Sequence, residues 1–323
     1  MKSRGAVAPP SVVFRYYRKQ ILRHRGLFTF VMLGTIGMQA ASLVSPLLLR
    51  QFFNTLTAAT PSPILAHHLL VTIGWIALAL IVGWAARRVQ SHSVMYLEAR
   101  VMGDLYLQAF DYLLGHSYQF FVSQFSGTLT RRVSKYAAAF ETLFDGIMTT
   151  FVPTFIYVLG AVVVLFIRNH TLGIALFLWA VFFFVLQIYV SRLRQPLRDA
   201  RAAEDSALTG TLADAISNQN TISLFSAAKH EHGILRKAVD RWHAATMRSW
   251  LANDYIWSVQ SLLMVGINIG LLWGALYFWQ RGELTVGDFV LIQSYLIGIF
   301  DNLNNLTPNL RRFYDALADG GEM

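Results

Sequence analysis

Apolar residues gather in blocks of about 20 along the chain, with polar and charged stretches between them. A helix rises about 1.5 Å per residue, so a block of about 20 residues can cross roughly 30 Å of hydrocarbon. The pattern predicts six membrane spans, at residues 27–49, 64–86, 143–167, 172–190, 255–279 and 286–306. The sixth is the weakest, because polar residues follow its apolar first half. We therefore expect an all-α polytopic membrane protein.

The segments between the spans alternate in length and in charge. Three short connections hold one cation each (Arg50, Arg168 and Arg281), whereas the remaining segments hold all the other Lys and Arg residues. Because cytoplasmic segments of membrane proteins are enriched in Lys and Arg, this places both termini in the cytoplasm. The first apolar run is longer than the core of a signal peptide, which predicts an uncleaved span, most simply in a bacterial inner membrane.

The two long cytoplasmic connections have helical periodicity. Apolar residues recur every three to four positions after residues 87 and 202, so the spans should continue as helices well beyond the bilayer. Residues 115–127 and 217–228 interrupt this pattern. We expect two cytoplasmic helical hairpins, each with a short cross-piece at its tip, and a second helix that runs over residues 64–114.

The sequence divides into three parts on this reading. Residues 1–26 form a cytoplasmic tail with an amphipathic elbow helix at the membrane interface, since aromatic and basic residues alternate over 11–22. Residues 27–310 form the six-helix domain. Residues 311–323 form a stub that leads toward a further domain.

Composition agrees with a lipid environment. Hydrophobic residues make up 55% of the 323 residues and charged residues only 14%, with a mean hydropathy of +0.44, whereas soluble proteins carry about 25% charged residues. The net charge of +9 follows the membrane topology, so we expect no nucleic-acid partner. The chain has no cysteine, and the spacing of His230, Glu231 and His232 does not place two ligands on one helical face, so we expect no metal site.

Four local patterns resemble the membrane domain of ABC exporters, of the half-transporter, multidrug and lipid-flippase type. The first is Phe120-Phe121 followed by Gly127, Leu129 and Arg132 at the first cross-piece. Tyr136 stands where that family usually has an aspartate. The other three are Asp214-Ala-Ile with Ile222 and Phe225, the 282–289 turn GELTVGDF, and the ending 311–318.

The resemblance implies a type-1 transmembrane domain that is driven by a nucleotide-binding domain. The chain contains no G-x-x-x-x-G-K-[ST] loop, which cradles nucleotide phosphates, so we expect no ATP hydrolysis by this chain itself. ATP and magnesium would bind to the missing domain, either fused beyond Met323 or carried by a separate chain. The implied partners are that ATPase domain, a second copy or homologue, and the bilayer.

The resemblance also assigns the two cross-pieces to coupling with the nucleotide-binding domain. Exposed apolar clusters commonly mark contact sites, whereas the alternative is an ordinary solvated turn. The residues assigned to coupling are Ser117, Tyr118, Phe120, Phe121, Gln124, Gln219, Thr221, Ile222, Leu224 and Phe225.

Polar residues within the spans are candidates for a substrate pathway, because such residues usually face a cavity or a partner helix. The candidates are Gln293, Asp301, Asn302, Asn305, Gln187 and Asn268. Two alternatives stay open: the sixth helix has already left the membrane at residues 301–305, and Gln187 and Asn268 bond to a neighbouring helix, as Gln39 and Gln260 also could.

We therefore expect a permease that exports a solute, or flips a lipid, by alternating access as a dimer. Phenylalanines in the fourth span hint at an apolar or amphipathic cargo, although lipid contact explains them equally well. The rival hypothesis is a secondary transporter or an intramembrane enzyme without an ATPase partner. Asp145 is the one carboxylate in the five strong spans, and proton-coupled carriers usually need more ionisable groups at that depth.

Overall fold

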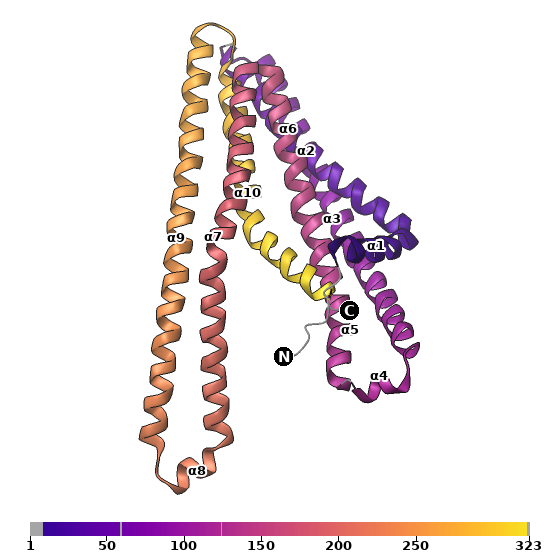
Figure 1. The fold of residues 1–323 in the computed structure, drawn as a ribbon. Coiled ribbons are helices and arrows are strands. Elements are labelled where there is room, and N and C mark those ends of the chain that lie inside the picture. The colour runs from indigo at the N-terminus through magenta and orange to yellow at the C-terminus, as the bar shows by residue number, and fades with distance from the viewer. Residues whose placement is uncertain (1–8, 59, 124, 322–323) are drawn as a thin grey trace. The chain divides into compact units, whose positions relative to one another are not determined.

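The computed structural model describes residues 9–58, 60–123 and 125–321, and every regular element in this part of the chain is helical (Figure 1). Six of the helical stretches are long and apolar enough to cross a membrane, which confirms the predicted all-α polytopic class. The elements are α1 (Pro10–Ile21), η1 (Leu22–His24), α2 (Arg25–Ala58), α3 (Pro63–Leu114), α4 (Tyr118–Ser123), α5 (Ser126–Asp145), η2 (Gly146–Phe151), α6 (Val152–Arg168), α7 (His170–Ser217), α8 (Gln219–Leu224), α9 (Ala228–Gln280) and α10 (Val286–Gly320).

Both predicted helical hairpins are present, and their helices are interrupted at the positions that the sequence predicted. Helix α3 runs without interruption to Leu114, and the short helix α4 follows. Helix α7 ends at Ser217, α9 begins at Ala228, and α8 lies between them. Ser62 begins α3 because its Oγ accepts a hydrogen bond from the Leu65 amide at 3.2 Å, and Pro63 suits the first helical position.

The chain divides into two compact units, which we describe separately. The first, here called the core unit, contains the described residues up to Leu176 and from Leu271 onward. The second, the hairpin unit, is Phe177–Gly270. Three short connections in the core unit (residues 59–62, 169 and 281–285) define what we call its short-loop end; the opposite end carries α4.

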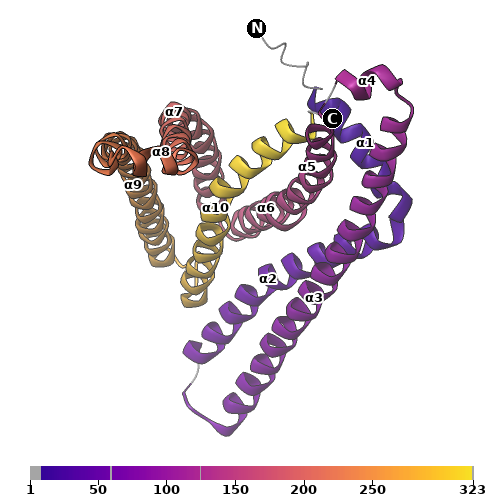
Figure 2. The same cartoon turned by 90° about the horizontal axis from the view of Figure 1, so that it is seen from below.

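Helices α2 and α3 lie side by side along much of their length in the core unit (Figure 2). Gly34 permits this approach, because a Cβ atom there would lie 2.7 Å from the backbone nitrogen of Gln90. Fully buried side chains such as Val31, Leu97 and Phe140 join α2 and α3 to α5 in one hydrophobic core. Burial of this apolar surface positions α5 beside them.

A buried carboxylate joins three elements at the short-loop end. Asp288, with 2% of its side chain exposed, accepts hydrogen bonds from Arg50 Nε at 2.6 Å and from Arg168 Nε and Nη2 at 3.0 Å each. It also accepts bonds from the Thr285 amide and hydroxyl. The amide bond forms a capping box at the start of α10, together with the bond that the Thr285 side chain accepts from the Asp288 amide. The GELTVGDF turn therefore fastens the start of α10 to α2 and α6.

The hairpin unit consists of antiparallel α7 and α9, connected at one end through α8. A buried hydrogen bond from Gln260 to Gln187 links the two helices. Gln187 therefore bonds to a neighbouring helix, which was the alternative to a position in the substrate pathway. Further along, the Arg194 guanidinium bonds Asn253 at 2.5 Å and the Trp242 indole bonds Asp205 at 3.0 Å. Polar contacts thus fasten the pair at several levels.

Two helices depart from the predicted spans. The third contains a π-helical turn, η2, directly before Pro153. The sixth does not end near residue 306: α10 continues to Gly320, so the expected stub at 311–323 begins as part of the same helix. The continuation is amphipathic, with Ala316 buried against the hydrophobic core and Arg312 exposed.

Candidate substrate cavity and coupling tips

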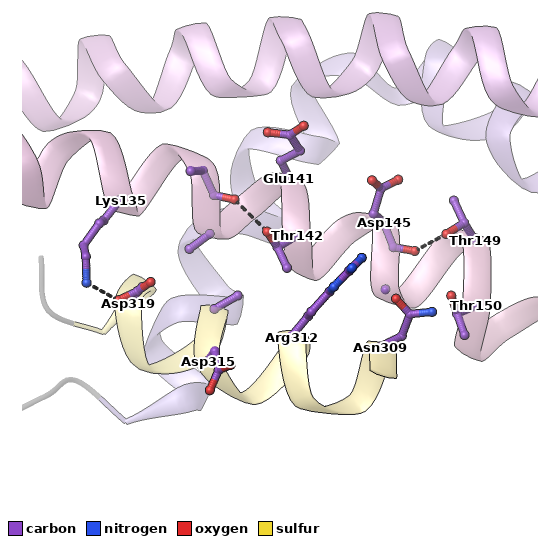
Figure 3. Close-up of a pocket in the computed structure, with 14 residues that line it drawn as sticks. Lys135, Glu141, Thr142, Asp145, Thr149, Thr150, Asn309, Arg312, Asp315 and Asp319 are labelled. Atoms are coloured by element: carbon purple, nitrogen blue, oxygen red, sulfur yellow. Dashed lines mark hydrogen bonds and ion pairs between the residues drawn. The ribbon is translucent and has the colours of Figure 1, made fainter. Parts of the chain in front are cut away.

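A cavity of about 620 Å³ lies in the core unit between α10 and the continuous stretch of α5 and η2 (Figure 3). It occupies the half of α10 that lies away from the short-loop end. Its lining residues are Lys135, Ala138, Ala139, Glu141, Thr142, Asp145, Gly146, Thr149, Thr150, Asn309, Arg312, Asp315, Ala316 and Asp319.

Helical periodicity builds both walls. Along α5 and η2 the lining positions recur at 135, 138, 142, 145 and 149, and along α10 at 309, 312, 316 and 319. Positions three and four residues apart share one helix face. Phe140, Leu143 and Phe144 of α5 are buried in the hydrophobic core. Their packing fixes the orientation of the polar face of α5 that lines the cavity.

The lining carries both signs of charge. An ion pair between Lys135 and Asp319 bridges the two walls. Figure 3 shows Arg312 extending from α10 toward the α5 wall, and its guanidinium forms no ion pair or hydrogen bond with any described residue. Arg312 is therefore available to an anionic group, since a guanidinium binds carboxylate or phosphate oxygens in a planar geometry.

Carboxylates and hydroxyls complete the polar surface. Glu141 and Asp145 belong to the α5 wall and Asp315 to α10, and Figure 3 shows the Glu141 and Asp145 carboxylates turned away from α10. The Thr149 hydroxyl donates to the Asp145 carbonyl at 2.7 Å, which leaves its oxygen free to accept a further hydrogen bond. This arrangement can hold a hydrophilic solute that carries an anionic group.

The π-helical turn lies at one end of this cavity and is supported from α2 and α3. Gln90 donates hydrogen bonds to the Met148 carbonyl at 3.0 Å and to the Thr35 hydroxyl at 2.9 Å. Gln39 donates to the Pro153 carbonyl. A π turn and a proline both disturb the regular backbone ladder, so these two buried glutamines bond to carbonyls in the disturbed segment.

The structure places the predicted pathway residues elsewhere. On α10, Asp301 and Asn305 are exposed and Gln293 is half-buried. Asn302 donates to the Gly298 carbonyl at 2.8 Å and accepts a bond from Thr154 at 3.4 Å. None of these four lines the cavity, which lies further along the same helix. Gln187 and Asn268 belong to the hairpin unit.

Sequence reasoning missed most of the cavity. It singled out Asp145 as a lone carboxylate but did not connect it with Lys135 or with Arg312, Asp315 and Asp319. The available signal was the spacing of polar residues by three or four within an otherwise apolar helix. Which residues of α10 oppose which residues of α5 is decided by tertiary packing.

The α4 tip presents apolar side chains to solvent. Tyr118 is 85% exposed, and Val122 and Phe125 are also well exposed. Phe120 packs against His116, with ring centroids 4.4 Å apart, and against Phe121. Ser117 is exposed as well, while Gln124 lies outside the described residues. Phe120 is thus held by ring contacts within the tip, while Tyr118 and Phe125 present aromatic surface to solvent.

The α8 tip in the hairpin unit has the same character. Leu224 and Phe225 are exposed, Phe225 by 79%. Gln219 donates a hydrogen bond to Ser223 at 3.2 Å, and the Thr221 carbonyl accepts one from the Phe225 amide at 3.1 Å, while Ile222 is half-buried. Contiguous exposed apolar groups of this kind are typical of an interaction site.

Comparison with known proteins agrees with this architecture. The family described as the ABC transporter transmembrane region matches residues 28–303. An ATM1-type heavy metal exporter of Novosphingobium aromaticivorans is 25% identical over 209 residues, covering 64% of this chain and 34% of the exporter. Mouse ATP-binding cassette sub-family B member 6 is 24% identical over 287 residues, covering 86% of this chain and 34% of the mouse protein.

The chain thus spans about a third of the length of these relatives. Its fold is similar to a solved structure of a bacterial Atm1-family ABC exporter with ATP bound, with a TM-score of 0.68 at 20% identity, covering 94% of this chain and 52% of that one. Because the matched region covers most of the sequence, this protein belongs to the ABC transporter transmembrane-region family.

Proposed function

We propose that this chain is the permease part of an ATP-driven exporter that works by alternating access. The observation that carries the proposal is the position of the cavity. One wall, α5, begins three residues after the α4 tip, and the other wall is the last helix, α10. Movement of a docked ATPase domain at α4 would therefore pass along α5 directly to the cavity.

The active assembly in this proposal contains partners beyond this chain. A nucleotide-binding domain, in the same or a separate polypeptide, binds ATP and magnesium and contacts the α4 and α8 tips. A second copy or a homologue completes the transporter. Positive charge in the long segments supports a cytoplasmic position for both tips and both termini, as in a bacterial inner membrane.

The cavity lining favours a hydrophilic, anionic solute over a lipid. Arg312 would bind an anionic group of the solute, and the hydroxyls of Thr149 and Thr150 would bond to its polar groups. One relative is named a heavy metal exporter, so a heavy metal held by a charged small-molecule ligand is the first solute to test. The phenylalanines of the fourth span, which suggested an amphipathic cargo, include exposed Phe177, Phe182 and Phe184 and do not line the cavity.

The test is transport by the complete transporter in sealed vesicles, with a cadmium–thiol complex and a fluorescent phospholipid as two probes. We expect ATP-dependent uptake of the cadmium complex. Arg312→Gln should weaken apparent affinity about ten-fold, since a charge-assisted hydrogen bond contributes about 1.5 kcal/mol or more. Arg100→Gln is the matched control, because Arg100 is exposed on α3 and does not line the cavity.

The outcomes separate the hypotheses. Transport of the phospholipid alone would overturn the hydrophilic assignment and leave the exporter class intact. Uptake of either probe that requires an ion gradient and does not depend on ATP would support the secondary-transporter alternative and would overturn the proposal as a whole.

A further inference from the structure

The first helix carries a basic face that has no ion-pair partner among the residues that the structure describes. Arg15, Arg18 and Lys19 are exposed on α1, and Arg23 and Arg25 follow just before the apolar run of α2. The sequence of α1 contains no acidic residue. None of these five cations forms an ion pair with a described residue. Asp104 of α3 bonds to the neighbouring His24, at 2.9 Å.

Helical geometry concentrates these charges. Arg15 and Lys19 are four residues apart, and Arg15 and Arg18 are three apart, so their side chains are neighbours on one face. Like charges at this spacing destabilise a helix by a few tenths of a kcal/mol per pair. An external anion next to this face would remove that repulsion.

Buried contacts hold the basic face in a fixed orientation. The Tyr17 hydroxyl donates to the Tyr136 carbonyl of α5 at 2.7 Å. Gly320, near the end of α10, lies so close to α1 that a Cβ atom there would be 2.9 Å from the Tyr17 hydroxyl oxygen and 3.2 Å from a methyl carbon of Val13. Helix α1 is therefore fastened to both helices that form the cavity walls, with its cations on the surface.

The exposed residues beside these cations suit a membrane surface. Phe14, Tyr16 and Leu22 are each about two-fifths exposed, and the Arg15 guanidinium lies over the Tyr16 ring at 5.8 Å. Aromatic and basic residues together are typical of helices at the boundary of headgroups and acyl chains. The apolar run that begins at Leu27 fixes α1 near that depth.

We propose that the basic face of α1 binds anionic phospholipid headgroups of the leaflet on the α4 side of the membrane. Charge complementarity selects this occupant, since each Lys or Arg near an anionic leaflet favours binding by roughly five-fold. The site goes beyond the transport proposal and does not depend on which solute is exported.

The absence of cysteine from the sequence makes a direct test possible. In the full chain, Tyr16→Cys carries a single fluorescent label on α1. The protein is reconstituted in phosphatidylcholine vesicles with an equal small fraction of brominated phosphatidylglycerol or brominated phosphatidylcholine, and quenching of the label is compared. We expect the anionic quencher to be preferred by about three-fold or more, and the preference to fall in 0.5 M NaCl through screening.

A matched pair of variants locates the effect. Replacing Arg15, Arg18 and Lys19 together by Gln in the labelled chain should bring the two quenchers to equal efficiency. Replacing the exposed Lys229, Arg236 and Lys237 of α9 by Gln makes the same change in net charge and should leave the preference intact. Equal quenching by both lipids in the labelled chain with its basic face intact would overturn the proposal, even if the triple variant does not fold. A preference for the anionic quencher that remains in a folded triple variant would also overturn it.

Discussion

At the scale of single residues, Asp288 is the most constrained charge in the core unit. One carboxylate satisfies two arginines and the capping box of α10. Asp288→Asn keeps the size of the side chain but leaves Arg50 and Arg168 facing each other without a counter-charge. Breaking a buried ion pair costs about 3 kcal/mol or more, so we expect a clearly lower thermal unfolding midpoint in detergent, measured by tryptophan fluorescence.

Glu283→Gln is the matched control for this substitution. Glu283 is exposed in the same turn, and among the described residues its carboxylate accepts a hydrogen bond from Asn169 alone, at 3.4 Å, so this substitution should change the midpoint little. A double variant, Arg168→Gln with Asp288→Asn, should lose less than the sum of the two single losses, because the two groups interact directly. Additive losses would contradict the ion-pair explanation.

The sequence indicated the importance of this turn but not its chemistry. The GELTVGDF pattern was recognised, and Arg50 and Arg168 were counted as isolated cations of short loops. Residues 50, 168 and 288 meet only through the packing of three helices, and no local spacing records such a contact. For the same reason Arg312 and Asp145 were not connected with one another across the cavity.

At the scale of elements, the π-helical turn depends on Gln90 of α3. Gln90→Leu is close in volume but removes the donor to the Met148 carbonyl and to the Thr35 hydroxyl. A buried acceptor without a partner costs about 1–3 kcal/mol. We expect a lower unfolding midpoint and faster amide hydrogen exchange in residues 146–152, measured by mass spectrometry.

Gln195→Leu is the comparison at an exposed site, since Gln195 bonds only Asp199 in its own helix, at 3.0 Å. Its exchange pattern over residues 146–152 should match that of the unaltered protein. Unchanged exchange in Gln90→Leu would show that the π turn does not rely on this glutamine.

Helix boundaries were predictable where a local signal exists. Apolar periodicity gave the end of α3 at Leu114 and the break between Ser217 and Ala228, because turn-forming residues interrupt the pattern there. The π turn precedes Pro153, but a proline alone does not distinguish a π turn from a simple kink or a regular helix start. The extension of α10 to Gly320 was missed because hydropathy falls where the helix becomes amphipathic.

At the scale of the whole molecule, the proposed function requires the two exposed tips to transmit the movement of an ATPase domain. Tyr118→Ser and Phe225→Ser each remove an aromatic side chain that is about four-fifths exposed, so the fold of the chain should be unaffected. Their removal should weaken docking, because buried aromatic anchors commonly contribute 2 kcal/mol or more at interfaces. We expect ATP-driven transport by the assembled transporter to fall about ten-fold or more, with an unchanged unfolding midpoint. Tyr277→Ser, an aromatic change at the short-loop end, should leave transport unaltered; full activity of both tip variants would mean that the ATPase domain docks elsewhere.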